Sequence, residues 1–159
     1  MNTSELETLI RNILSEQLAP AKTETKGNGI FPSVGEAIEA AHQAFLRYQQ
    51  SPLKTRSAII HALREELTPH LASLAAESAA ETGMGNKEDK FLKNKAALDN
   101  TPGIEDLTTT ALTGDGGMVL FEYSPFGVIG SVAPSTNPTE TIINNSISML
   151  AAGNSVYFS

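Results

Sequence analysis

Apolar side chains recur along the chain with two different periods, and the change of period divides it into a helical part and a mixed part. From residue 4 to about residue 98 they recur every three or four positions, which is the spacing of one face of an α-helix. After residues 102–103, a Pro-Gly pair, the pattern becomes that of extended strands. We therefore expect several helices first, followed by strands and one further helix.

The first helix is predicted over residues 4–18. Ser4 and Glu7 have the spacing of a capping box, which is typical of a helix start. Residues 19–29 contain Pro and Gly, show no apolar period and are interpreted as a linker. Because an isolated helix of ~15 residues is marginal in water, its apolar face indicates docking on another protein, on the rest of the chain or on copies of itself. That face includes Leu6, Leu9, Ile10, Ile13 and Leu14.

Two helices are predicted after the linker. The first begins at Ser33, three residues before Glu36, in a second capping pattern. The second covers about residues 53–67, after the break at Pro52. The residues expected on their buried faces are Val34, Ala37, Ile38, Ala41 and Phe45 in the first helix, and Ile59, Ile60, Leu63 and Leu67 in the second.

Two more helices are predicted before residue 102. Thr68 is interpreted as the N-cap of one, with Pro69 in the first helical position and Gly83 at its end. Asn86 caps the other, which runs through Leu98. The polar face of this helix is expected to expose Lys87, Lys90, Lys93 and Lys95.

The part after residue 103 predicts a hairpin and then a β–α–β unit. Residues 108–112 and 118–123 have the composition of strands, and the Gly-rich residues 113–117 join them as a turn. An apolar run at 128–133, a helix over 139–152 and a second apolar run at 156–158 follow. Two parallel strands joined by a helix form the unit of a doubly wound sheet, so the fold class expected is α/β.

Composition and charge exclude several kinds of site and partner for this chain. The 159 residues have a net charge of −7 and no cysteine, which excludes disulfides, Cys-ligated metals and a cysteine nucleophile within the chain. The acidic balance argues against nucleic acid and anionic membranes as partners, and no apolar run reaches the length of a membrane span. The start lacks a basic secretory n-region, so a cytoplasmic protein is expected. No metal site is expected either, because the three histidines lack ligand spacing.

The charge is also unevenly distributed along the chain. Residues 96–159 contain six acidic residues and no basic one. A phosphate bound by this part would therefore have to rely on backbone N–H groups and helix N-termini.

The stretch that carries candidate chemistry lies between Pro134 and Pro138. These prolines enclose a short loop after a buried strand and before a helix, and open α/β sheets bind ligands at such loops. The side-chain amide of Asn137 can donate a hydrogen bond to a developing oxyanion. It can equally cap the helix as an acceptor, and the residues alone leave both interpretations open.

Three segments together resemble the start of the cofactor domain of the aldehyde dehydrogenase superfamily. They are Phe126-Gly-Val-Ile-Gly130, the spacing Pro134-x-x-x-Pro138 and Leu150-Ala-Ala-Gly-Asn154. The loop sequence Pro134-Ser-Thr-Asn-Pro138 resembles the coenzyme A-acylating branch, and residues 1–29 resemble targeting peptides of enzymes packed into bacterial microcompartments. The resemblance covers essentially the whole chain. It implies an incomplete Rossmann-like doubly wound domain over residues 30–159, in which the hairpin at 107–123 belongs to an oligomerisation sheet.

The resemblance also implies an activity. It favours a branch member that converts propionaldehyde, coenzyme A and NAD to propionyl-CoA and NADH during propanediol degradation in a microcompartment lumen. An acetaldehyde enzyme of ethanolamine-type compartments is the alternative within the family, and an inactive shell-docking module is the alternative outside it. Residues 1–18 would bind a shell protein, and full-length family members form homo-oligomers.

Site residues follow from the same resemblance. Those that would line the nicotinamide side of the cofactor are Val132, Ala133, Pro134 and Ser135, and Thr136 is also expected to bind the cofactor. Ser159 stands where the family commonly has a lysine that contacts the adenosine ribose. The family's oxyanion asparagine is third in the loop, where Thr136 stands, so Asn137 is our candidate and Thr136 its alternative. Family members are longer and use a downstream cysteine to attack the aldehyde; we therefore expect this chain to be an N-terminal fragment that is inactive alone.

Overall fold

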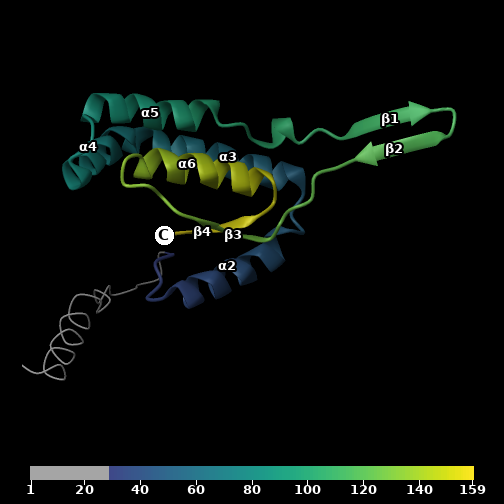
Figure 1. Cartoon of the computed structure of the whole chain (residues 1–159), viewed down its shortest axis with the longest axis horizontal. Helices are drawn as coiled ribbons and strands as arrows, with labels where there is room; N and C mark the ends of the chain where they lie inside the picture. The colour runs from purple at the N-terminus through teal and green to yellow at the C-terminus, as the bar shows by residue number, and fades with distance from the viewer. Residues whose placement is uncertain (1–28) are drawn as a thin grey trace, which may run out of the picture. The chain divides into compact units, whose positions relative to one another are not determined.

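The computed structural model describes residues 29–159 (Figure 1). The helix predicted over residues 4–18 and the linker up to residue 28 lie outside the described residues. The chain divides into two compact units, residues 1–37 and residues 38–159. Apart from the start of α2, which belongs to the first unit, the packing discussed below lies within the second unit.

Helices and strands follow one another in the predicted order. The helices are α2 (Val34–Tyr48), α3 (Leu53–Leu67), α4 (Leu71–Thr82), α5 (Lys87–Asn100) and α6 (Pro138–Ala151). Short 3₁₀ turns, η1 (Thr68–His70) and η2 (Ile104–Asp106), precede α4 and follow α5. The strands are β1 (Thr110–Gly114), β2 (Gly117–Phe121), β3 (Val128–Ser131) and β4 (Ser155–Phe158). No helix among residues 29–159 is both long and apolar enough to cross a membrane.

The core of the second unit lies between α6 and the helices α3, α4 and α5, which surround one side of it (Figure 1). From α6 it contains three residues spaced four apart, Ile143, Ile147 and Ala151. The other helices contribute Ile60, Leu71 and Leu98. This spacing places the apolar side chains of α6 on one face, and burying that face holds the helix in place above the strands.

The β–α–β unit forms as predicted. β3 and β4 pair in parallel, with Val128 opposite Ser155 and Ser131 opposite Phe158. The buried side chain of Asn154 accepts a hydrogen bond from Gly127 N at 2.9 Å, which fixes the two strand starts together. Helix α2 lies on the side of the strands away from α6 (Figure 1), and Ser155 Oγ at the start of β4 donates to the carbonyl of Ala41 at 2.7 Å.

Helix α2 begins as predicted, but the prediction of its buried face is only partly right. Ser33 Oγ accepts a hydrogen bond from Glu36 N at 3.2 Å, which confirms the capping pattern. Ala41 is buried, whereas Val34 is 56% exposed and Ile38 is 40% exposed. Within the second unit, Ala41 lies against the start of β4, and Ile38, three residues earlier, stays largely exposed.

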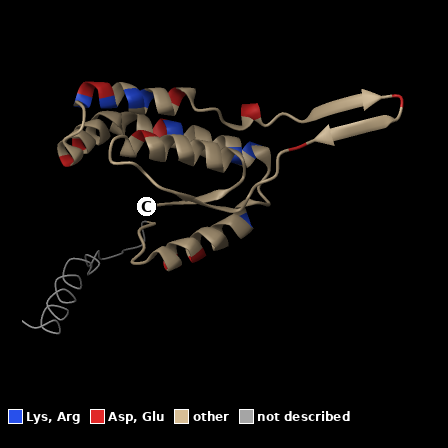
Figure 2. Ribbon diagram, in the orientation of Figure 1, with Lys and Arg blue, Asp and Glu red and all other residues tan. Residues whose placement is uncertain are grey.

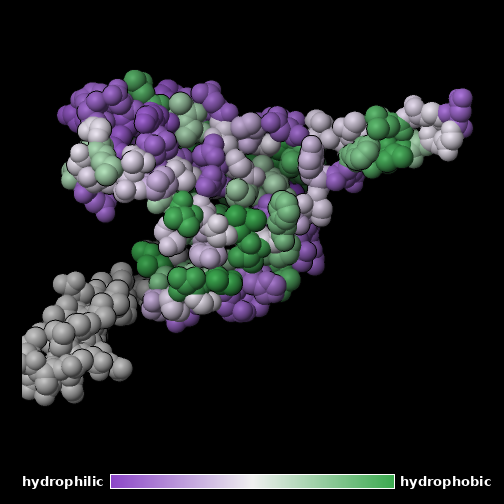
Figure 3. Space-filling model, in the orientation of Figure 1, coloured by the Kyte–Doolittle hydropathy of each residue, from purple (hydrophilic) through white to green (hydrophobic). Residues whose placement is uncertain are grey.

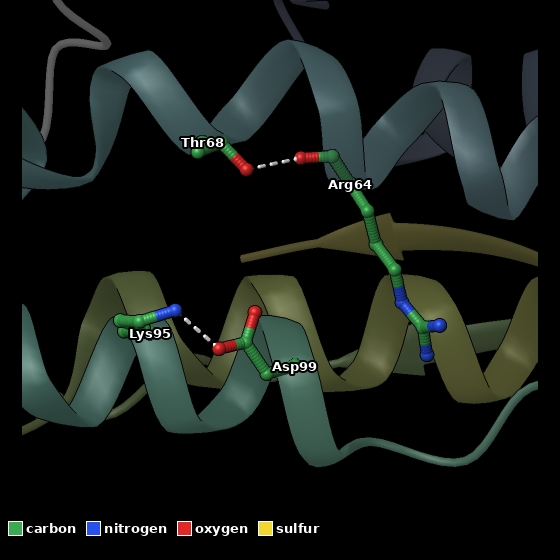
Figure 4. Close-up of polar contacts among 4 residues, drawn as sticks. All are labelled: Arg64, Thr68, Lys95 and Asp99. Atoms are coloured by element: carbon green, nitrogen blue, oxygen red, sulfur yellow. Dashed lines mark hydrogen bonds and ion pairs between the residues drawn. The ribbon is translucent and has the colours of Figure 1, made fainter.

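The prediction that Thr68 caps α4 is wrong. Its hydroxyl donates to the carbonyl of Arg64 at 2.7 Å, one turn back along α3 (Figure 4). Thr68 therefore ends α3, and η1 separates it from α4. The guanidinium of Arg64 extends away from Thr68 (Figure 4) and donates to the carbonyl of Thr101, which ties the end of α5 to α3. The lower part of the same view shows the ion pair between Lys95 and Asp99 on α5.

The hairpin β1–β2 is antiparallel, with Gly114 opposite Gly117 and a two-residue turn between them. This confirms that the Gly-rich residues form a turn. Every residue of both strands is exposed, and the apolar ones form a visible patch on the hairpin (Figure 3). The hairpin is thus held by backbone pairing, with its apolar side chains uncovered within the described residues.

Candidate functional site

The loop between β3 and α6, residues 132–137, lies where the sequence placed it. The strands continue to pair beyond their last residues, because Ser159 N donates to Ser131 O and Ala133 N donates to Ser159 O, both at 3.0 Å. These bonds place Ser159 beside the start of the loop, at the carboxyl ends of both parallel strands. The structure therefore brings Ser159 beside Ala133, and the other cofactor candidates, Val132 and residues 134–136, belong to the same loop.

The loop presents an open surface. Val132 is 79% exposed, and Pro134, Ser135 and Thr136 are exposed as well. Ala133 and Asn137 are half-buried. A turn in which Asn137 N donates to the carbonyl of Pro134 at 3.2 Å holds the loop compact and leads directly into α6.

The side chain of Asn137 does not cap α6. Asn137 occupies the N-cap position, and its backbone carbonyl accepts a hydrogen bond from Thr141 N, but its side chain makes no capping bond. Instead, Asn137 Oδ1 accepts a hydrogen bond from Lys93 Nζ at 3.1 Å. Of the two interpretations that the sequence left open, capping by the side chain is excluded, and the amide Nδ2 group has no partner among the described residues.

Two lysines of α5 reach the loop, and sequence reasoning missed both. Lys93 contacts Asn137, and Lys90 Nζ donates to the carbonyl of Thr136 at 3.0 Å. The prediction that Lys90 is exposed is wrong, because only 6% of its surface is accessible. The cluster of basic residues on α5 is visible in Figure 2. Although residues 96–159 contain no basic residue, positive charge therefore lies against this loop, supplied by an earlier helix.

Polar contacts fix α6, and with it the end of the loop, against its neighbours. Thr139 Oγ1 donates to Asn94 Oδ1 at 2.7 Å, and Asn94 is 1% exposed. Asn145 Nδ2 donates to Ser131 Oγ, at the end of β3, at 2.8 Å. Helix α6 is thus held at its start by α5 and at its middle by the end of β3.

A groove of about 520 Å³ lies beside these contacts. Thr136 and Asn137 form one wall, and the other is formed by residues of α5 and of the turn before it, including Met84, Asn86, Lys90 and Lys93. As predicted, Asn86 caps α5, since its Oδ1 accepts from Asp89 N at 2.8 Å. The groove combines two amides, two ammonium groups, the carboxylate of Asp89 and apolar side chains, which suits a polar organic molecule.

Ionisable groups with shifted pKa values lie outside this groove. The backbone N–H of Gly103 donates to Glu105 at 2.7 Å, and this bond lowers the pKa of the Glu105 carboxyl. Burial raises the pKa of Tyr48, opposed by the nearby Arg56 guanidinium. His42, His61 and His70 are exposed, and no cluster of three or more His, Cys, Asp or Glu suited to a metal ion occurs among residues 29–159.

The model of the aldehyde dehydrogenase family matches residues 28–158. The chain is 96% identical, over all 159 residues, to propanal dehydrogenase (CoA-propanoylating) of Citrobacter freundii and covers 34% of that relative. It therefore spans about a third of the length of the curated relatives it matches.

Solved structures agree with this match. A propionaldehyde dehydrogenase of Rhodopseudomonas palustris, with bound CoA and an acylated cysteine, is 48% identical with a TM-score of 0.81, over 84% of this chain and 31% of that one. A propionaldehyde dehydrogenase from the Clostridium phytofermentans fucose utilisation microcompartment is 48% identical with a TM-score of 0.78, over 82% and 30%. An engineered glycolyl-CoA reductase with bound NADP+ has a TM-score of 0.80 at 48% identity, over 85% and 31%.

Proposed function

The chain belongs to the aldehyde dehydrogenase family, and on that premise we propose that it is the N-terminal part of a coenzyme A-acylating aldehyde dehydrogenase. The proposed reaction converts propionaldehyde, coenzyme A and NAD to propionyl-CoA and NADH. The observation that carries this proposal is the 96% identity, over the whole chain, to a CoA-propanoylating relative. This identity favours propionaldehyde over the acetaldehyde alternative.

The loop after β3 fits a nucleotide cofactor. It lies at the carboxyl end of two parallel strands, which is where open α/β sheets hold such ligands. The first N–H groups of α6 have no partner within the helix and favour an anionic group. In the proposed complex, residues 132–136 and Ser159 hold the cofactor, whose nicotinamide supplies the hydride acceptor.

Asn137 is proposed to stabilise negative charge on the reacting aldehyde. When a thiolate adds to a carbonyl, charge develops on the carbonyl oxygen, and a fixed N–H donor stabilises it. The Nδ2 group of Asn137 is such a donor, because Oδ1 is already engaged by Lys93. Thr136 is the alternative donor, but its side chain is exposed.

The thiolate itself comes from outside these residues. The 159 residues contain no cysteine, and a thioester cannot form without a thiol. We therefore propose that the 159-residue chain alone forms no propionyl-CoA. It contributes the oxyanion donor and part of the cofactor surface to a longer enzyme.

The proposed location is a bacterial microcompartment, and the proposed partner of residues 1–18 is a shell protein. The support is the aliphatic stripe in the sequence together with the microcompartment origin of one structural relative. Residues 1–18 fused to a fluorescent reporter should collect in compartments. A variant with Leu9 and Ile13 changed to Ser should stay diffuse, and a diffuse parent fusion would contradict the targeting role.

The activity is tested by grafting. The 159 residues replace the matching segment of the Citrobacter freundii relative, and this hybrid is called the grafted enzyme. We expect NADH formation that requires both propionaldehyde and coenzyme A, whereas the 159-residue chain alone should give none. NADH formation that is independent of coenzyme A, or turnover by the chain alone, would contradict the proposal.

A further inference from the structure

We propose that Lys93 and Lys90 of α5 are positioning residues for the Thr136–Asn137 segment. Lys93 holds the Asn137 amide so that its N–H group is free for the substrate, and Lys90 fixes the backbone beside it. This inference rests on the proposed function, because it assigns to Asn137 the role of oxyanion donor. It adds two residues of α5 to the candidate site, although none of the site residues predicted from the sequence lies on that helix.

The geometry brings two neighbouring lysines to two neighbouring loop residues. Residues three apart on a helix lie on the same face, so the side chains of Lys90 and Lys93 extend in the same direction. Their ammonium groups bind successive acceptors, Thr136 O at 3.0 Å and Asn137 Oδ1 at 3.1 Å. All four residues line the same groove.

The contact with Lys93 determines which way the Asn137 amide faces. An asparagine side chain has one acceptor atom and one donor group, and a lysine ammonium can only donate. Lys93 therefore binds Oδ1 and leaves Nδ2 as the group available to an oxyanion. A positive charge at the oxygen also polarises the amide, which makes its N–H a stronger donor.

Lys90 restrains the backbone of the same segment. Its side chain is buried at 6% exposure, and no ion pair joins it to a carboxylate in the described part of the chain. An apolar residue of similar length would avoid the desolvation cost of a buried ammonium. The function we assign to that ammonium is to hold the Thr136 carbonyl, and so the peptide that joins Thr136 to Asn137.

The test uses the grafted enzyme with propionaldehyde as the substrate and kcat and KM as readouts. We expect Asn137→Ala to lower kcat by about 10²–10³-fold and Lys93→Met by about three- to tenfold, with KM changed less than about twofold. Lys93→Arg, which keeps a donor, should restore most of the rate. Adding Lys93→Met to Asn137→Ala should have no further effect, since the amide it orients is gone.

Lys90→Met should lower kcat by about threefold or more. If Lys90→Met does not fold, the kcat values of the Lys93 variants still test whether α5 positions the Asn137 amide. Lys87→Met is the matched control on α5, because Lys87 is exposed and its one ion pair in the described part of the chain is with Glu88. It should leave kcat unchanged.

The outcomes separate the two proposals. If Asn137→Ala lowers kcat but Lys93→Met leaves it unchanged, this inference is overturned and the oxyanion role of Asn137 stands. Losses from Lys93→Met and Asn137→Ala that simply multiply also overturn it, because the lysine then acts independently of the amide. If Asn137→Ala leaves kcat unchanged, both the oxyanion role and this inference are overturned.

Discussion

Helix α6 and the hairpin β1–β2 are both rich in apolar residues, yet one buries them and the other does not. Ile143, Ile147 and Ala151 of α6 are at most 3% exposed, whereas Met118 and Leu120 of the hairpin are 63% and 56% exposed. The same residue types thus serve two purposes. In α6 they position the loop that carries the candidate site. In the hairpin they form an exposed apolar surface of the kind that binds another protein. We propose that this partner is the oligomerisation sheet of another copy.

The largest expected effect comes from truncating one apolar residue in each region. Ile147→Ala should destabilise the 159-residue chain by about 2–5 kcal/mol, because it removes a fully buried side chain and leaves a cavity. Leu120→Ala in the hairpin should change the stability by less than about 0.5 kcal/mol, since its side chain is exposed. Urea unfolding followed by circular dichroism measures both. Equal losses would show that the hairpin packs on the chain itself.

A smaller difference is expected between two threonine hydrogen bonds. Thr139→Val removes the donor to the buried Asn94 and should cost about 1–3 kcal/mol, because it leaves a buried acceptor unpaired. Thr109→Val removes an exposed bond to Glu122 at 3.2 Å and should cost less than about 0.5 kcal/mol. Urea midpoints of the two variants give the comparison. A costlier Thr109→Val would contradict the view that the hairpin contributes little to the fold.

The smallest effect concerns pH and lies in η2, which leads from α5 to the hairpin. The pKa of Glu105 is lowered in the fold by the N–H of Gly103. A carboxyl with a lowered folded pKa stabilises the fold above its unfolded pKa, and this contribution is lost as the pH falls through the folded value. Glu105→Gln should therefore be less stable than the parent at pH 7, and the difference should shrink as the pH falls below the ordinary pKa of a carboxyl group and through the lowered folded value.

Thermal melts of the parent and of Glu105→Gln across this pH range measure the effect. Glu122→Gln in the hairpin is the matched control, because among residues 29–159 the Glu122 carboxylate accepts a hydrogen bond from the exposed Thr109 side chain alone. A stability difference for Glu105→Gln that grows on acidification would have the wrong sign.

Local signals in the sequence predicted the elements well. The spacing of Ser33 and Glu36 located the start of α2, and Asn86 located the start of α5. The Gly-rich turn and the two apolar runs predicted the hairpin and the parallel pair. Each of these patterns depends on residues that are close together in the sequence, so it can be recognised without knowledge of the fold.

Long-range contacts explain what was missed. Lys90, Asn94 and Leu98 are spaced four apart, so the buried Leu98 marks Lys90 as facing inward, but the charge of Lys90 suggested a solvated face. The prediction for Thr68 was wrong because a threonine hydroxyl can donate to a carbonyl of the helix before it as well as accept from an N–H of the helix after it. That Lys93 would reach Asn137 depends on how α5 packs against α6, which no local pattern encodes.

The most direct test of the site is the kcat of two neighbouring variants of the grafted enzyme. Asn137→Ala should lower kcat by about 10²–10³-fold, as expected for the loss of an oxyanion donor. Thr136→Val should lower it by less than about threefold, because Lys90 contacts the backbone of Thr136 rather than its exposed side chain. The reverse order, with Thr136→Val the costlier change, would contradict the account and assign the donor to Thr136.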